Sequence, residues 1–279
     1  MEAAAAARSP GRSSRGRRLR RDLEGFAVVA GYVGLTLWLL SPLFAHPTQE
    51  VVNPLAEGTG GWLSLPDVNL IMWVLAWDCH ALATAPWRLF DANIFYPAPS
   101  ALAGSEHMLG HLVIFGPVYG VSGNPVLANQ INLLLSIALC GAAMYALLRH
   151  WGTPAAAALF GGFVYAFAPI RIYGTPHVHL LAGQYLPLAL LFLDRTLTHE
   201  SVRAALAFGA FLLLQMLCSY YLAYMTATAL VGYAIGVACS TRMRLSRRGV
   251  TLVLAAAAVA GVLLTLVSLP YLAAKEIGV

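Results

Sequence analysis

The stretch Phe26-Ala-Val-Val-Ala-Gly-Tyr-Val-Gly-Leu-Thr-Leu-Trp-Leu-Leu-Ser-Pro-Leu-Phe-Ala45 is predominantly apolar and carries no charged side chain. A helix rises about 1.5 Å per residue, so these roughly twenty residues suffice to cross the ~30 Å hydrocarbon core of a bilayer. The stretch is longer than the apolar core of a typical signal peptide, and no small-residue cleavage site is obvious after it. We therefore expect a first transmembrane helix that stays in the protein.

The composition of the whole chain is that of an integral membrane protein. Of its 279 residues, 59% are hydrophobic and 10% are charged, whereas about 25% are charged in a soluble domain. Almost no polar sequence remains from which a soluble domain could form. The pattern predicts an all-α, polytopic transmembrane helical bundle. Its further helices are expected near residues 127–148, 154–169, 178–195, 204–239 and 250–273.

The chain divides into three parts on this view. Residues 1–24 form a basic leader that contains Ser and Gly and that we expect to be disordered. Residues 25–273 form the membrane domain, which includes a long first loop over residues 46–108. Residues 274–279 follow directly after an apolar run, as expected if the chain is the N-terminal portion of a longer protein.

Basic residues concentrate in two clusters. Seven arginines lie between Arg8 and Arg21, and the second cluster is Thr241-Arg-Met-Arg-Leu-Ser-Arg-Arg248. Positive residues that flank transmembrane helices stay in the cytoplasm, so we interpret both clusters as topogenic and place the N-terminus inside. Neither cluster belongs to a folded surface that reads bases, so we expect no nucleic-acid partner.

Two cytoplasmic clusters must be separated by an even number of crossings. The run 204–239 is nearly twice as long as one crossing needs, so we expect two helices that turn near residues 218–221. The run His111–Val121 then does not cross. In the alternative, residues 109–123 cross and 204–239 is one long tilted helix. Both counts place loop 46–108 outside the membrane.

This outer loop holds half of the twelve acidic residues of the chain. Carboxylates are costly near a bilayer and are usually functional, so chemistry is expected here. The loop contains a single Arg88 and the acids Glu50, Glu57, Asp67, Asp78, Asp91 and Glu106.

Residues 66–80 are expected to form a helix on, or dipping into, the outer leaflet. Pro66 is suited to a helix start, and Asp67 would lie near the positive end of the helix dipole. Eleven residues at about 100° each place Asp67 and Asp78 on one face. Trp73 and Trp77 are suited to an interfacial depth. The purely structural interpretation is that Asp67 caps the helix.

The other candidates have structural alternatives too. Asp91 stands in ordinary turn sequence. The Glu106-His107 pair is either an interfacial anchor or part of a weak metal site, with no zinc spacing nearby. Arg171 lies with His177 and His179 in a second outer loop, where it would hold a phosphate or pair with a loop acid.

Five short motifs follow one another along the chain. They are Phe90-Asp-Ala-Asn-Ile-Phe-Tyr-Pro97, Ser105-Glu-His-Met-Leu-Gly110, Gly123-Asn-Pro-Val-Leu-Ala128, Tyr165-Ala-Phe-Ala-Pro-Ile-Arg171 and Gln184-Tyr-Leu-Pro-Leu-Ala-Leu-Leu-Phe-Leu193. With these motifs the chain resembles, over about residues 20–225, poorly characterised bacterial polytopic proteins described as YfhO-like or as GT-C-type glycosyltransferases. The string FDANIFYP is the most specific of the motifs.

The resemblance implies an inverting sugar transfer from a polyprenyl-phosphate donor at the outer face of the bacterial cytoplasmic membrane. It implies that Asp67 is the catalytic base, with Asp91 and Glu106 as candidates for a second acid. Arg171 would clamp the lipid phosphate, assisted by His177 or His179. The chain departs from the family in having fewer helices and no C-terminal soluble domain.

The implied cofactors and partners are few. The resemblance assigns no definite cofactor and leaves the metal requirement open, since such enzymes can hold Mg²⁺ or Mn²⁺, for which Asp67 and His107 are weak ligand candidates. The partners would be the polyprenyl-phosphate-linked sugar and membrane lipid. Two other classes stay open, a non-catalytic transporter or flippase for a lipid-linked or envelope substrate and a structural membrane subunit. A transporter predicts ionisable groups at mid-bilayer depth, yet the predicted helices are nearly free of charge.

Overall fold

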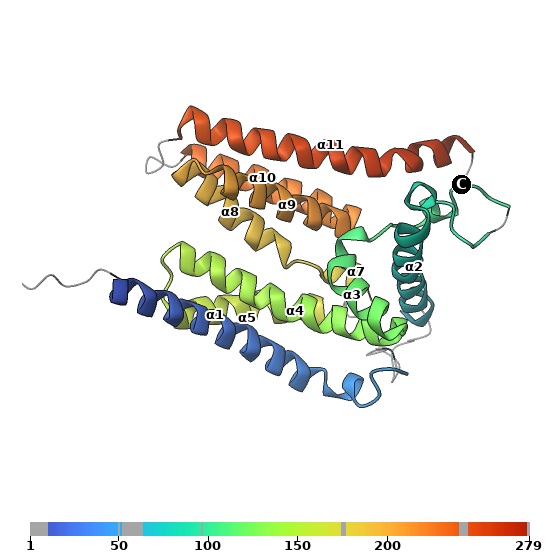
Figure 1. Ribbon diagram of the computed structural model, residues 1–279, viewed down its shortest axis with the longest axis horizontal. Helices are drawn as coiled ribbons and strands as arrows, with labels where there is room; N and C mark the ends of the chain where they lie inside the picture. The colour runs from blue at the N-terminus through green and yellow to red at the C-terminus, as the bar shows by residue number, and fades with distance from the viewer. Residues whose placement is uncertain are drawn as a thin grey trace, which may run out of the picture.

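The computed structural model describes residues 11–49, 51, 64–95, 97–173, 177–239 and 245–277. Every regular element within these residues is a helix (Figure 1). Seven helices make up the body of the bundle. They are α1 Gly11–Leu39, α4 Pro125–His150, α5 Ala155–Phe167, α8 Tyr185–His199, α9 Val202–Cys218, α10 Tyr220–Cys239 and α11 Arg247–Ile277.

The other elements are shorter or lie across one end of the bundle. Four of them are α-helices and four are 3-10 turns. They are η1 Ser41–Phe44, α2 Ser64–Thr84, η3 Pro86–Arg88, η4 Ala101–Gly104, η5 Leu109–His111, α3 Leu112–Ser122, α6 Pro169–Tyr173 and α7 Val178–Leu181.

Four helices in the described part of the chain are long and apolar enough to cross a membrane. The qualifying segments are Asp22–Leu39, Pro125–His150, Tyr220–Val237 and Arg247–Ala274. The polytopic helical bundle expected from the sequence agrees with this finding. Helices α5, α8 and α9 were also expected to cross, but they contain 13, 15 and 17 residues and are shorter than a full span.

Helix α1 begins earlier than expected. The expected disordered leader covered residues 1–24, but the helix starts at Gly11, so residues 11–24 form its first turns. The physical reason is that arginine and leucine are good helix formers and that no proline interrupts residues 11–24. Residues 1–10 lie outside the described residues.

The expected helix 178–195 is also different in the structure. It is divided into α7 and α8, because the backbone leaves the helical conformation at Ala182–Gln184. Pro187 stands in the first turn of α8, where the missing N–H of proline interrupts no helical hydrogen bond. The helix then continues to His199.

The run 204–239 contains two helices, as predicted. Helix α9 ends at Cys218, Ser219 is extended with φ −168° and ψ 146°, and α10 begins at Tyr220. Helix α3 has 11 residues, so it is only about 16 Å long, roughly half a hydrocarbon core. The division of 204–239 into two helices is confirmed, whereas the number of crossings stays a prediction, because α5, α8 and α9 are, like α3, shorter than a full span.

Helix α4 lies at the centre of the bundle and contacts α1, α3, α5 and α8. It begins where the Oδ1 atom of Asn124 accepts a hydrogen bond from the backbone N–H of Leu127 at 3.0 Å. Helix α1 packs closely against it through Tyr32. A Cβ atom at Gly141 would lie 2.7 Å from the Tyr32 ring, so only glycine permits this approach.

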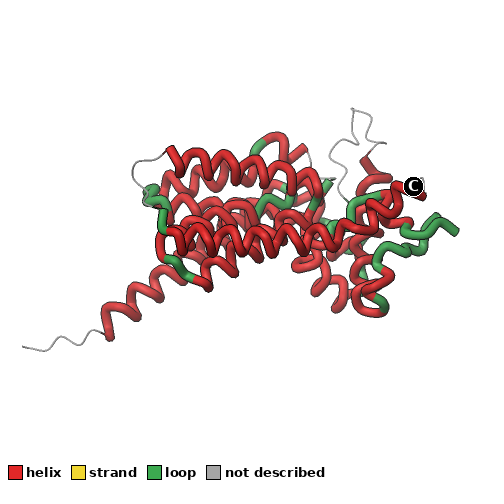
Figure 2. Tube along the Cα trace, turned by 90° about the horizontal axis from the view of Figure 1, so that it is seen from above, coloured by secondary structure: helices red, strands yellow, loops and turns green. Residues whose placement is uncertain are grey.

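The two ends of the bundle differ in chemistry. One end, here called the basic end, contains the start of α1 and the connections after α4, α8 and α10, with Arg149, Arg195, Arg203, Arg247 and Arg248. Helices α2, α3 and α7 lie at the opposite end, here called the cavity end. The long helices run between these ends in both views (Figures 1 and 2).

The helix expected around residues 66–80 is confirmed as α2. It runs across the cavity end, roughly perpendicular to the long helices (Figure 1). Trp73 and Trp77 stack with ring centroids 6.5 Å apart, and the Nε1–H of Trp77 donates to the carbonyl of Leu89 at 2.7 Å. This crosswise helix supplies Asp67 to the end of the bundle. Glu50 and Glu57 lie outside the described residues.

Candidate functional site

A cavity of about 550 Å³ opens at the cavity end of the bundle. Helix α2, the segment before η5, the segment around α7, the start of α10 and the end of α11 surround it. Four of the candidates expected from the sequence line it together. The lining residues are Asp67, Leu70, Ile71, Ala103, Gly104, Ser105, Glu106, Met108, His177, His179, Tyr220, Tyr221 and Tyr271.

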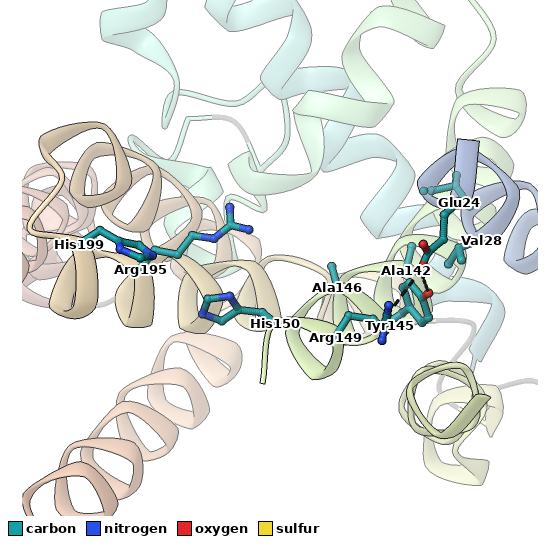
Figure 3. Close-up of a pocket in the computed structure, with 11 residues that line it drawn as sticks. Glu24, Val28, Ala142, Tyr145, Ala146, Arg149, His150, Arg195 and His199 are labelled. Carbon is teal, nitrogen blue, oxygen red and sulfur yellow. Dashed lines mark hydrogen bonds and ion pairs between the residues drawn. The ribbon is translucent and has the colours of Figure 1, made fainter. Parts of the chain in front are cut away.

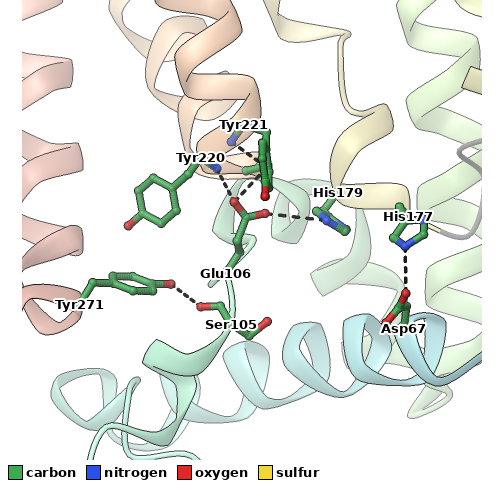
Figure 4. Close-up of polar contacts among 9 residues, drawn as sticks. Asp67, Ser105, Glu106, His177, His179, Tyr220, Tyr221 and Tyr271 are labelled. Atoms are coloured by element: carbon green, nitrogen blue, oxygen red, sulfur yellow. Dashed lines mark hydrogen bonds and ion pairs between the residues drawn. The ribbon is translucent and has the colours of Figure 1, made fainter. Parts of the chain in front are cut away.

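Asp67 pairs with His177, which directly precedes α7. The Nε2 atom of His177 lies 3.1 Å from Oδ2 of Asp67, within hydrogen-bond distance (Figure 4). Asp67 stands in the first turn of α2, where the helix dipole favours a negative charge. Its side chain is 50% exposed and that of His177 is 36% exposed. The pair is therefore open to a ligand in the cavity.

Glu106 is held by the start of helix α10. Its Oε1 atom accepts a hydrogen bond from the backbone N–H of Tyr220 at 2.7 Å and another from the hydroxyl of Ser219 at 3.1 Å. The first N–H groups of a helix have no partner within the helix, so this carboxylate caps α10. One oxygen of Glu106 is thus committed to the fold.

The second oxygen of Glu106 faces His179 across the cavity wall. Oε2 lies 3.8 Å from the Nε2 atom of His179, which is longer than a hydrogen bond. Burial, together with the nearby His111 and His177, lowers the pKa of His179 to about 4. The imidazole is therefore neutral at neutral pH, and the two groups are neighbours without a full ion pair.

Arg171 is not among the residues that line this cavity. Its Nη1 atom donates to the carbonyl of Leu181 at 2.6 Å, and its guanidinium carbon lies 4.6 Å from the ring centroid of Tyr165. Gly183 packs so closely that an added Cβ would lie 2.3 Å from Nη2. The guanidinium thus satisfies a carbonyl at the end of α7, just before the break in the chain.

Asp91 also lies away from the cavity. Its Oδ2 atom is 3.4 Å from the Nε atom of Arg88, and its Oδ1 atom accepts from the backbone N–H of Ser100 at 3.3 Å. Both contacts are exposed and hold the turn after η3. Asp91 therefore stabilises a turn, which is the structural alternative to a catalytic role that its sequence context predicted.

His107 packs between aromatic rings. Its ring centroid lies 5.5 Å from that of Tyr220 and 6.2 Å from that of Tyr271. Burial lowers the pKa of His107 to about 4. Among the described residues, no three His, Cys, Asp or Glu side chains gather in a group that could hold a metal ion.

Three tyrosines in the cavity were not anticipated. Tyr220 and Tyr221 follow the break before α10, and Tyr271 comes from α11. The hydroxyl of Tyr271 donates to the carbonyl of Ser105 at 2.9 Å, which ties the end of α11 to the loop of Glu106. The only sequence feature that could have indicated these residues is the position of Tyr220 and Tyr221 at a predicted break between two helices. No sequence feature indicated that Tyr271 would lie in the cavity.

No protein-family model matches the chain, and neither a curated protein nor a solved structure is similar to it.

Proposed function

We propose that this chain is the membrane part of a GT-C-type glycosyltransferase, which uses a polyprenyl-phosphate-linked sugar at the cavity end of the bundle. The observation that carries the proposal is the Asp67–His177 pair at 3.1 Å, half exposed in a cavity of about 550 Å³. A positioned carboxylate with an orienting imidazole is suited to take a proton from an acceptor hydroxyl. The resemblance of the motifs between residues 20 and 225 names the reaction class.

The proposed reaction is a single displacement at the anomeric carbon of the sugar. Asp67 removes the proton of the acceptor hydroxyl, whose oxygen forms the new bond to that carbon. The bond between that carbon and the phosphate oxygen breaks, and polyprenyl phosphate leaves with the electron pair. The configuration at the anomeric carbon is inverted.

The phosphate-binding roles follow from the contacts of each side chain. His177 and His179 line the cavity and are the phosphate ligands that the resemblance implies, and the N–H that His177 gives to Asp67 in the structure would have to be transferred to the phosphate. Arg171 is engaged by the carbonyl of Leu181 at 2.6 Å, so we assign it the positioning of the α6–α7 segment that carries both histidines. Glu106 holds the start of α10 and is a weaker candidate for the second acid.

The alternative of a transporter receives less support from the bundle. It calls for ionisable groups within the membrane-spanning helices. In the described part of the four candidate spans the buried polar side chains are amides and hydroxyls. They are Thr36 of α1, Asn129, Gln130, Asn132 and Ser136 of α4, and Thr226 of α10.

The test uses the full chain in liposomes of neutral lipid, with a panel of polyprenyl-phosphate hexoses and pentoses as donors. The readout is the release of polyprenyl phosphate, which does not depend on the identity of the acceptor when a crude envelope extract supplies it. Asp67→Asn is expected to reduce this release at least about 100-fold, the usual contribution of a general base.

The matched control is Asp91→Asn, an acid in the same loop that lies outside the cavity. It is expected to release polyprenyl phosphate at the wild-type rate within about twofold. Equal rates for Asp67→Asn and wild type would remove Asp67 as the base. No release from any donor by the wild-type chain would overturn the proposed function.

A further inference from the structure

A second large cavity, of about 750 Å³, lies at the basic end of the bundle. Its basic side chains come from two helices that contact each other, Arg149 and His150 from α4 and Arg195 and His199 from α8 (Figure 3). Glu24 of α1 is the one carboxylate that lines it. Nothing in the proposed sugar transfer uses this cavity, which is at the opposite end from Asp67.

The positive charge of this cavity is only partly neutralised. The Nε atom of Arg149 lies 3.4 Å from Oε1 of Glu24, and the hydroxyl of Tyr145 donates to the same oxygen. The Nη1 atom of Arg149 donates to the carbonyl of Thr153 at 3.0 Å, so its Nη2 atom is the part of the guanidinium that these contacts leave to a ligand. The guanidinium carbon of Arg195 lies 5.3 Å from the ring centroid of Phe192. Among the described residues no carboxylate pairs with Arg195. Two guanidinium groups therefore face one lining carboxylate.

Two histidines, His150 and His199, also line the cavity and can form hydrogen bonds there. His150 is bound at 2.6 Å to Asp194, a residue that does not line the cavity. His199 stands one helical turn beyond Arg195 and has no carboxylate partner in the described part of the chain. An anion that enters the cavity would thus meet Arg149, Arg195 and His199.

An apolar groove adjoins this basic cavity. The groove has a volume of about 650 Å³ and shares Glu24, Val28 and Tyr145 with the cavity. It follows α1 from Glu24 to Leu35, a length of about 16 Å at the rise of a helix. Its other walls are apolar, and they include Leu159, Phe160 and Phe163 of α5.

We propose that the basic cavity and the groove together bind one anionic phospholipid. The phosphate of the headgroup contacts Arg149 and Arg195, and one acyl chain lies in the groove beside α1. Basic pockets between transmembrane helices on the cytoplasmic side are suited to acidic headgroups. The groove favours a lipid over free phosphate, because its apolar walls, about 16 Å long, can bury an acyl chain and form no hydrogen bonds with an inorganic ion.

The first experiment measures binding of dioleoyl phosphatidylglycerol and dioleoyl phosphatidylcholine to the full chain in neutral detergent, by native mass spectrometry. The wild type is expected to prefer the anionic lipid. The double variant Arg149→Gln, Arg195→Gln is expected to bind phosphatidylglycerol roughly 30-fold more weakly, the factor that corresponds to about 1 kcal/mol for each arginine. Its binding of phosphatidylcholine should not change.

Two variants control for folding and for general loss of charge. Arg195→Gln alone breaks no ion pair and should weaken phosphatidylglycerol roughly fivefold. Arg88→Gln removes an exposed arginine at the cavity end and should leave binding unchanged. Equal phosphatidylglycerol affinity in wild type and the double variant, or equal affinity of wild type for both lipids, would overturn the proposal.

The second experiment separates a lipid from a free phosphate. Gly31 lines the groove and has open space where a Cβ would be, so Gly31→Leu partly fills the groove. It should weaken phosphatidylglycerol binding and leave any displacement by inorganic phosphate unaltered. Gly34→Leu changes the same helix outside the groove and serves as the control. If inorganic phosphate displaces the lipid at matched concentrations and Gly31→Leu has no effect, the site binds free phosphate and the lipid proposal fails.

Discussion

Asp78 is a carboxyl group with no exposed surface in the helix that carries the candidate base. Neither of its oxygens has a hydrogen-bond partner among the described residues. Burial raises its pKa well above the usual range of an aspartate. The side chain is therefore protonated in the folded protein over a wide pH range, and keeping it unpaired costs about 1–3 kcal/mol of stability.

This burial predicts a pH dependence of stability that Asp78→Asn removes. A carboxyl with a folded pKa above its unfolded value of 3.8 binds more protons in the native state, so stability falls as the pH rises. The stability that it contributes is complete below pH 3.8 and is lost as the pH rises through the raised folded pKa. The difference in Tm between Asp78→Asn and wild type, measured in detergent, should grow from pH 5 to pH 8.

The comparison with Asp78→Asn isolates one group. Burial lowers the pKa values of His107, His111 and His179 to about 4, and these groups act in the opposite direction between pH 4 and 6.5. Their effects are common to both proteins and cancel in the difference. A difference in Tm that stays constant across this range would contradict the prediction.

At the scale of the elements, the start of α10 depends on a side chain from 114 residues earlier in the chain. Glu106→Ala is expected to lower the free energy of unfolding by about 1–2 kcal/mol, because it removes the acceptor for two donors at a helix end. Glu106→Gln should recover most of that loss, since its amide oxygen accepts the same two bonds. Chemical denaturation in detergent measures both.

The same pair of variants decides between two roles for Glu106. A cap predicts that stability and activity change together and that glutamine restores both. If Glu106→Gln keeps full stability and loses release of polyprenyl phosphate, Glu106 is the second acid that the sequence suggested. That outcome would replace the structural assignment.

The packing of η5 against α9 requires a glycine. A Cβ at Gly110 would lie 2.4 Å from the carbonyl oxygen of Leu214 and 2.8 Å from the backbone nitrogen of Cys218. Backbone atoms cannot move aside as a flexible side chain does, so Gly110→Ala should lower stability by about 1–3 kcal/mol.

The control for Gly110→Ala is Gly120→Ala, which lies in α3 with nothing within 4 Å of the new Cβ. Alanine is favoured over glycine in a helix by about 0.5–1 kcal/mol, so this variant should raise Tm. Equal Tm values for the two variants would mean that η5 is not packed as described. Thermal unfolding followed by circular dichroism is sufficient.

At the scale of the whole molecule, the basic clusters and the acidic cavity occupy opposite ends. Positive residues near helix ends orient a membrane protein with that end in the cytoplasm. The cavity with Asp67 and His177 would then open to the outside. Cys239 is an exposed native thiol at the basic end of α10, and Asn93 is exposed in the loop at the cavity end.

This orientation is tested with a membrane-impermeant maleimide on intact cells. Asn93→Cys in a Cys239→Ser background should react without permeabilisation, and Cys239 of the wild type should react only after it. Labelling of Cys239 in intact cells, with Asn93→Cys protected, would invert the proposed topology. The site of Asp67 would then face the cytoplasm.

The sequence by itself determined the class of protein and the position of most helices. Apolar runs and helical period are local properties, so the membrane bundle, helix α2 and the break near Ser219 could all be predicted. The same reasoning found the loop in which Asp67 and Glu106 lie. The predicted boundaries of α1 and α8 were less accurate. The basic segment at the start of α1 was expected to be disordered although it is rich in helix formers, and the interruption of the helix near Gly183 was not recognised.

Only the tertiary structure decided which of the candidate side chains meet. Asp67 and His177 are 110 residues apart, and their pairing depends on how α2 lies across the bundle. Arg171 was expected to bind a phosphate, but in the structure it donates to the carbonyl of Leu181. This carbonyl lies at the end of α7, where the helix supplies no N–H to pair with it. Such demands arise from packing and are not encoded in any one stretch of residues.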